Sequence, residues 1–103
     1  MPEAFDVEFT KRGYLILDAG VAQSFFPTDA VIAMPRGREL WVLPVNNRAS
    51  GGLLLKQRNA RGDRSVLVWH VMPGEESFDG TRPARWDPAN AALRIALDSA
   101  PGT

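Results

Sequence analysis

The chain has 103 residues, of which 45% are apolar and 23% charged, values typical of one folded domain rather than a disordered segment. Lysine and arginine balance aspartate and glutamate to a formal net charge of zero, and the absence of cysteine excludes disulfides, thiolate metal sites and thiol nucleophiles. His70 is the single histidine, which excludes sites built from several imidazoles. We therefore expect neither a metal nor a cofactor.

The strands and helix of the first half follow from its patterning. Apolar and polar residues alternate over 5–9, as in a half-buried strand, and a turn leads to a second strand at 14–17. Residues 18–26 show helical spacing and begin with an aspartate that can cap the first turn. Apolar segments at 30–34 and 39–43, joined by a connection rich in proline and glycine, indicate a second hairpin.

The second half indicates a third hairpin and a final segment of ambiguous pattern. Leucines at 53–55 and the segment 65–72 flank a polar tip at 59–63, and neither face of 65–72 is polar, so that strand is either central or covered by another subunit. Residues 73–85 have the composition of a loop. Residues 89–97 suit a helix or a strand, and their alternation favours a strand.

These elements predict a mainly β protein, a small barrel or sandwich of hairpins with one short helix. We expect a single domain over 1–103, with the polar segment 46–52 as a mobile loop and a point of possible subdivision. Trp41 and Trp69 are expected in the core, and Trp86 exposed in a loop.

The expected compartment is the cytoplasm, with no membrane contact. No apolar run approaches the roughly 20 residues that cross a bilayer, and the first six residues are acidic where a signal peptide is basic and then apolar.

Part of the first half resembles the swapped-hairpin unit of AbrB-type and MazE-type proteins. The segments that carry the resemblance, within residues 13–44, are 13–17, 19–26, 27–31 and 38–44. The resemblance implies an interleaved homodimer that binds DNA through basic residues of its first hairpin. In this chain Lys11 and Arg12 stand at those positions.

Basic charge is concentrated in the middle of the chain. Residues 34–64 carry seven lysine and arginine residues against two acidic residues. Lys56, Arg58, Arg61 and Arg64 lie on or beside the tip of the third hairpin, where they are placed to neutralise phosphates or to meet an acidic protein.

Two functions remain open at this point. The first is a non-catalytic binding or accessory protein, expected to be a homodimer, that docks a partner through the basic hairpin or Trp86. The second is a homodimeric DNA-binding transcriptional regulator that uses Lys11, Arg12 and the arginine-rich hairpin on phosphates. We expect no enzyme, because the sequence contains no nucleophile elbow, no phosphate loop and no pattern for paired carboxylates.

Overall fold

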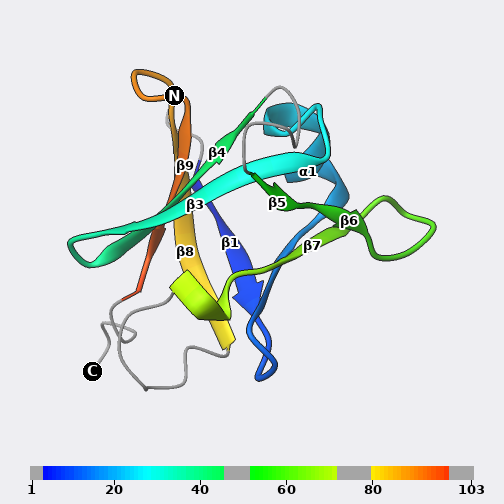
Figure 1. Cartoon of the computed structure of the whole chain (residues 1–103). Helices are drawn as coiled ribbons and strands as arrows, with labels where there is room; N and C mark the ends of the chain where they lie inside the picture. The colour runs from blue at the N-terminus through cyan, green and yellow to red at the C-terminus, as the bar shows by residue number, and fades with distance from the viewer. Residues whose placement is uncertain (1–3, 46–51, 72–79, 98–103) are drawn as a thin grey trace.

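The structure, a computed structural model, describes residues 4–45, 52–71 and 80–97, and in these residues one antiparallel sheet curls into a nearly closed barrel with a single α-helix (Figure 1). The strands are β1 (Ala4–Phe9), β2 (Tyr14–Leu17), β3 (Ala30–Arg36), β4 (Glu39–Pro44), β5 (Leu53–Leu54), β6 (Lys56–Gln57), β7 (Arg64–Leu67), β8 (Gly80–Asp87) and β9 (Ala92–Ala96). The helices are α1 (Ala19–Phe25) and a 3-10 turn, η2 (Trp69–Val71). The predicted fold class, a mainly β barrel of hairpins with one short helix, is confirmed.

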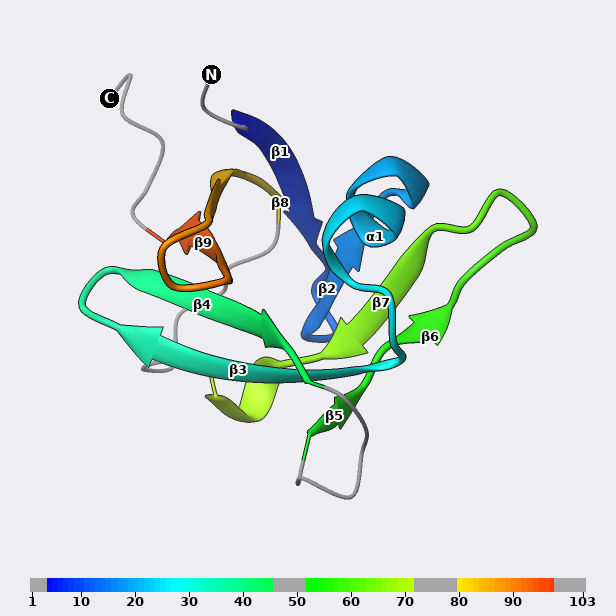
Figure 2. The same ribbon diagram turned by 90° about the horizontal axis from the view of Figure 1, so that it is seen from above.

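The barrel is closed by one short segment. The strand order is β5-β3-β4-β9-β8-β1-β2-β7-β6, so the two strands of residues 53–57 stand at opposite ends of the sheet. β5 pairs with β3 through Leu54 and Ala30, while β6 pairs with β7 through Lys56 and Ser65. Figure 2 shows β5 and β6 following each other along the chain. Residues 53–57 therefore connect the two ends of the sheet. Strands from both sides of residues 46–51 belong to this one sheet.

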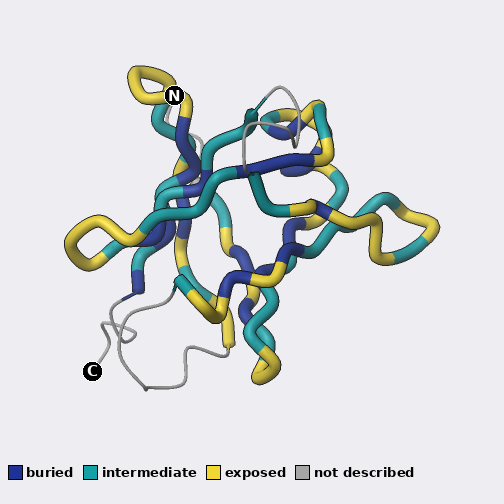
Figure 3. Tube along the Cα trace, in the orientation of Figure 1, coloured by how far each residue is buried: buried dark blue, intermediate teal, exposed yellow. Residues whose placement is uncertain are grey.

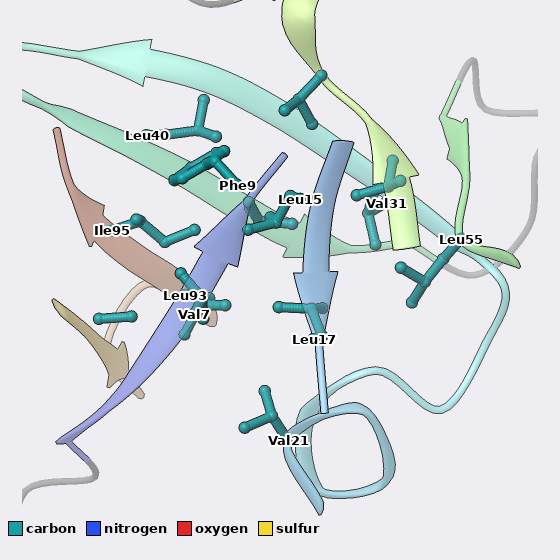
Figure 4. Close-up of a cluster of buried hydrophobic side chains, with 14 of the residues drawn as sticks. Val7, Phe9, Leu15, Leu17, Val21, Val31, Leu40, Leu55, Leu93 and Ile95 are labelled. Carbon is teal, nitrogen blue, oxygen red and sulfur yellow. The ribbon is translucent and has the colours of Figure 1, made fainter. Parts of the chain in front are cut away.

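Alternate side chains of the strands fill the barrel, as a period of two requires. Leu15 and Leu17 of β2 are fully buried, whereas the turns between strands are exposed (Figure 3). The residues labelled in the close-up of the core are Val7, Phe9, Leu15, Leu17, Val21, Val31, Leu40, Leu55, Leu93 and Ile95 (Figure 4). Every strand that contributes a core residue thus has an outward set of side chains left for the surface.

The predicted helix is α1, and it begins where expected. The Asp18 carboxylate accepts a hydrogen bond of 2.9 Å from the Val21 backbone N–H, which caps the first turn. Val21 and Ala22 are buried, and Phe26, which follows the helix, is 2% exposed. Figure 4 places Val21 beside Leu17, so α1 packs its apolar side onto the barrel core.

The first two predicted hairpins form, the second with a shorter connection than predicted. The third forms only in part, because Leu53–Leu54 of its predicted first arm is β5 and pairs with β3. β1 pairs with β2, β3 with β4, and β6 with β7, and the ambiguous segment 89–97 contains strand β9. β3 runs on through Pro35 and Arg36, so the turn of the second hairpin is Gly37 and Arg38 alone. Gly37 has a φ of +61°, which a glycine adopts without strain.

Strand β8 is absent from the sequence prediction, which gave residues 80–85 as a loop. Residues 80–85 pair with β1 along their whole length, whereas β9 pairs only with residues 84–87. At Pro83, β8 therefore pairs with β1 alone among the described strands. Proline has no backbone N–H to donate, and it is tolerated here because no described strand lies along the other edge of β8. The same reason explains Pro35 in β3, because β5 pairs only with Ala30 and Val31.

Of the strand predicted over 65–72, residues 65–67 belong to β7, and the prediction is wrong for residues 68–71. The Val68 N–H donates to the Gly13 carbonyl at 2.9 Å, and Gly13 lies in the turn that precedes β2, so β7 has no further partner residue. The chain then turns through η2, in which the Val71 N–H donates to the Val68 carbonyl at 2.9 Å.

Some predictions fall outside the described residues. These are the loop at 46–52, apart from Gly52, and residues 72–79 of the predicted loop and strand end. Among the described residues, no helix has the length and apolar character to span a bilayer.

Candidate functional site

Two arginines predicted for a basic surface are engaged within the chain. Arg61 forms an ion pair with Asp63, with 2.8 Å between NH2 and Oδ2. Arg64 is half-buried, and its NH1 donates to the Thr28 carbonyl at 3.0 Å. Arg61 nevertheless stays 80% exposed, whereas Arg64 is partly withdrawn from the open surface of the hairpin.

The remaining predicted cations are exposed and divide into two groups. Lys56 of β6 and Arg58 just after it belong to the third hairpin. Lys11 and Arg12 lie in the turn between β1 and β2, which is remote from the tip of the third hairpin in both views (Figures 1 and 2). The chain by itself does not bring these four cations onto one surface.

Asp63 fixes the hairpin tip to α1. Its carboxylate accepts hydrogen bonds from the Ala19 backbone N–H at 2.9 Å, Asn59 Nδ2 at 3.0 Å and Arg61 NH2 at 2.8 Å. The bond from Asn59, followed by those from Ala19 and Arg61, outweighs desolvation and lowers the pKa of Asp63. The tip is thus held as a structural element.

Trp86 is half-buried, which corrects the prediction of an exposed loop tryptophan. It lies in β8, and its ring stacks on Phe25 with centroids 4.5 Å apart. Phe26 meets the same ring edge-on at 6.2 Å. The strand pairing with β9 through Leu93 turns Trp86 toward the helix, so it anchors α1 to the barrel.

Trp69 is the exposed tryptophan, contrary to the prediction that it lies in the core. It begins η2, and 66% of the residue is exposed. Val66 and Val68 take the inward positions of this segment, and Leu67 and Trp69 the outward ones. His70, expected inside an apolar strand, is also exposed on η2.

Gly13 lies directly against the Cα and Cβ atoms of Trp69. Its φ is +91°, and a Cβ built at this position would lie 2.2 Å from Trp69 Cβ. Both the backbone conformation and the close approach require glycine here. The position of Trp69 is therefore fixed by the fold while its ring stays open.

A shallow pocket of about 260 Å³ lies beside Trp69 on the outer face of the barrel. Its lining residues are Tyr14, Leu53, Leu54, Lys56, Ser65, Leu67 and His70. Tyr14 pairs with Leu67 across β2 and β7, and Lys56 with Ser65 across β6 and β7, which places these outward side chains side by side. No acidic residue is among the lining residues.

We call this region the Trp69 surface, composed of Tyr14, Leu54, Lys56, Leu67, Trp69 and His70. The large hydrophobic residues that the structure leaves exposed in its described part are Leu54 at 36%, Leu67 at 38% and Trp69 at 66%. All belong to this surface. Trp69 has no ring contact or side-chain hydrogen bond with any described residue.

Trp41, on the outward face of β4, differs from Trp69 because its side chain has partners within the chain. The guanidinium carbons of Arg36 and Arg94, from the strands on either side, lie 4.6 and 4.8 Å from the centre of its ring. Its Nε1 donates to Glu39 Oε1 at 3.0 Å. Partners from this chain therefore occupy both the ring and the polar edge of Trp41.

The charges around Trp41 hold one another in place. Arg94 contacts Glu39 at 2.9 Å and Asp87 at 3.1 Å. Desolvation acts to raise the pKa of Glu39, but hydrogen bonds from Arg94 and Trp41 outweigh it and lower that pKa. Hydrogen bonds from Asn90 and then Arg94 lower the pKa of Asp87, and those to Glu39 and Asp87 raise the pKa of Arg94.

No protein-family model, curated protein or solved structure matches the chain. The resemblance to swapped-hairpin proteins thus stays a prediction. Sequence reasoning missed the Trp69 surface, although the pattern contained a signal for it: the segment 65–72 has two apolar faces, and one of them, with Leu67 and Trp69, is open.

Proposed function

We propose that this protein is a non-catalytic docking module whose Trp69 surface binds a segment of another protein that carries apolar and acidic side chains. The observation that supports the proposal is that Leu54 and Leu67, which line one pocket, and Trp69, the chain neighbour of the pocket residue His70, are all exposed. An exposed apolar surface that includes a tryptophan is typical of interfaces with other proteins.

Trp69 is the expected anchor of the interaction. Tryptophan is among the residues that contribute most binding energy at interfaces, especially beside a pocket that a partner side chain can fill. The Gly13 contact holds the Trp69 backbone in place before binding. Little conformational entropy is then lost on docking, which favours affinity.

The charges of the surface favour an acidic partner. Lys56 lines the pocket, and Arg58, which is also exposed, follows it on the same hairpin. Because no carboxylate lines the pocket, aspartate or glutamate next to the apolar side chains of a partner meets complementary charge.

A protein segment fits these features better than duplex DNA does. Arg64 faces the opposite side of the hairpin from Lys56, and the surface around Lys56 is made of leucine and aromatic side chains. Interfaces with DNA are more polar and much more positively charged than interfaces with proteins. The DNA-binding regulator remains the alternative hypothesis, and the experiment must distinguish it from protein docking.

The proposal is tested by selecting binders from a displayed library of random short peptides on the purified protein. We expect enrichment of peptides that combine leucine or aromatic residues with aspartate or glutamate. Trp69→Ala should weaken a selected peptide at least about tenfold, because truncating a central aromatic anchor commonly costs 2 kcal/mol or more. Lys56→Gln should weaken it less and flatten its salt dependence.

Arg85→Gln is the matched control for Lys56→Gln, because Arg85 is an exposed cation on β8, outside the Trp69 surface. Equal losses from both variants would contradict the proposal. A steep salt-dependent affinity for random-sequence duplex DNA, with no peptide enriched, would replace it with the regulator hypothesis. Self-association lost in Trp69→Ala, again without peptide binding, would assign the surface to a second copy of this chain.

A further inference from the structure

A second pocket, of about 330 Å³, lies between α1 and the hairpin of β6 and β7. Its lining residues are Ala22, Gln23, Phe26, Pro27, Gln57, Gly62 and Arg64. We call it the Arg64 pocket. In Figure 2, α1 and the chain from β6 to β7 lie side by side, and contacts from Asp63 to α1 agree with this arrangement.

The Arg64 pocket and the Trp69 surface lie on opposite faces of the same two strands. Gln57 and Arg64 form a register pair of β6 and β7, as do Lys56 and Ser65 one residue along. Because side chains alternate along a strand, the first pair faces the inward side with Val66 and the second faces outward. A ligand in one pocket therefore need not touch the other.

Arg64 is a half-buried cation with no acidic partner among the described residues. Its guanidinium donates once, from NH1 to the Thr28 carbonyl at 3.0 Å, and it forms no ion pair with any described residue. A charge drawn partly out of water without a partner is costly, and a guanidinium has five donors. Arg64 thus retains donors and an unbalanced charge at the wall of a pocket.

The other lining residues suit a small organic anion. Phe26 and Pro27 supply an apolar wall, and Gln23 and Gln57 supply amide groups. Gln57 Nε2 donates to the Asn59 carbonyl at 2.7 Å, which fixes that side chain at the rim. Ligand pockets typically combine such apolar walls with a few polar groups.

The pocket is held open by the contacts of the hairpin tip. Asp63 binds the Ala19 N–H, and Gly62, with a φ of +99°, brings the tip to within reach of α1. A Cβ at Gly62 would lie 3.4 Å from Ala19 Cβ, so the backbone closely approaches the helix. The wall that carries Arg64 is therefore set before any ligand arrives.

We propose that the Arg64 pocket binds the carboxylate of a compact, partly apolar organic acid. Arg64 would receive the carboxylate through its planar fork, and Phe26 and Pro27 would contact the apolar body. The volume of about 330 Å³ falls at the small end of ligand pockets, so a single-ring acid is the appropriate size. The carboxylate comes either from a free acid or from the C-terminus of a peptide.

The test is a titration of the ¹⁵N-labelled full chain with phenylacetate, followed by the backbone amide signals of Gln23, Gly62 and Arg64. We expect saturable shifts at these amides, and none with phenylacetamide, which has the same shape without the charge. Arg64→Gln should weaken phenylacetate at least about tenfold, since a hydrogen-bonded charge pair is lost. Arg58→Gln, an exposed cation of the same hairpin, is the matched control and should bind as the wild type.

Several results would overturn this proposal. They are the absence of saturable shifts in the wild type, equal binding of phenylacetamide, or equal losses from Arg64→Gln and Arg58→Gln. The phenylacetamide comparison uses the wild-type chain, so it decides the matter even if Arg64→Gln does not fold. Short peptides ending in phenylalanine, with a free or an amidated C-terminus, then separate the two sources of the carboxylate.

Discussion

Two tryptophans on the outer wall of the same barrel have opposite surroundings. Arg36 and Arg94 lie over the ring of Trp41, and Glu39 accepts its indole hydrogen. Trp69 is 66% exposed, and no described residue forms a ring contact or hydrogen bond with its side chain. Both residues lie on outward faces, and the sequence pattern alone does not tell them apart.

The comparison shows how a surface aromatic is assigned a role. An exposed ring whose partners come from its own chain stabilises the fold, because cation–π contacts and hydrogen bonds are already made. A tryptophan whose backbone is held in place but whose ring has no partner within the chain remains available to another molecule. We therefore assign Trp41 to the stability of the barrel and Trp69 to docking.

The largest expected effect concerns Gly13, which lies directly against Trp69. Gly13→Ala should lower the free energy of unfolding by about 2 to 4 kcal/mol, because a residue with a positive φ is strained and its Cβ would overlap Trp69 Cβ. Urea denaturation measures the change.

Gly37→Ala is the control for this substitution. Gly37 also has a positive φ, of +61°, but nothing lies within 4 Å of a Cβ built there. It should cost only the backbone strain, about 1 kcal/mol. If Gly13→Ala and Gly37→Ala lower the free energy of unfolding equally, the close approach of Gly13 to Trp69 adds nothing to the loss. Gly13 then does not fix the position of Trp69, contrary to our assignment.

The next effect compares the two tryptophans directly. Trp41→Ala should lower the free energy of unfolding by about 2 kcal/mol, since it removes two cation–π contacts, a hydrogen bond to Glu39 and buried ring area. Trp69→Ala should cost less than about 0.5 kcal/mol, because alanine keeps the Cβ that lies over Gly13. Equal costs in parallel denaturation experiments would make Trp69 a structural residue.

A smaller effect is expected from acid. The pKa values of Glu39 and Asp87, beside Trp41, lie below their ordinary values of 4.5 and 3.8. At low pH the unfolded chain binds more protons than the folded one, so this stability is present above the ordinary pKa values and is lost as pH falls through the folded ones.

Denaturation across a pH series measures the effect, with Glu39→Gln as the variant. The free energy of unfolding should stay level from pH 7 down to about pH 5 and then decline, and the decline should be shallower in Glu39→Gln. A steeper decline in the variant would contradict the assigned ion pair with Arg94.

Local patterns predicted most of the fold. Alternation gave β1, the turn after it gave β2, the Asp18 cap gave α1, and the weak alternation after residue 89 gave β9. β8 was missed because Pro83 and the glycines around it are typical of loops. Its pairing with β1 depends on contacts distant in sequence, which no local pattern contains.

The candidate site was predicted less well, for a related reason. Lys56, predicted for the basic hairpin, lines the pocket of the Trp69 surface, but Trp86 and Trp69 were assigned to each other's environments. The partner that buries Trp86 is Phe25 on α1, and the turn at Gly13, just before β2, determines where β7 stops and Trp69 emerges. Both are tertiary facts. Likewise, whether Arg64 is a surface cation depends on which face of β7 meets α1.

The most direct test follows the three tryptophan indole N–H signals of the ¹⁵N-labelled protein during titration with a peptide from the library selection. Trp41 and Trp86 are occupied by partners within the chain, whereas Trp69 is open. We expect the indole signal of Trp69 to shift and saturate with the peptide while the other two remain in place. A shift confined to Trp41 or Trp86, or binding with no change at Trp69, would contradict the assignment of docking to the Trp69 surface.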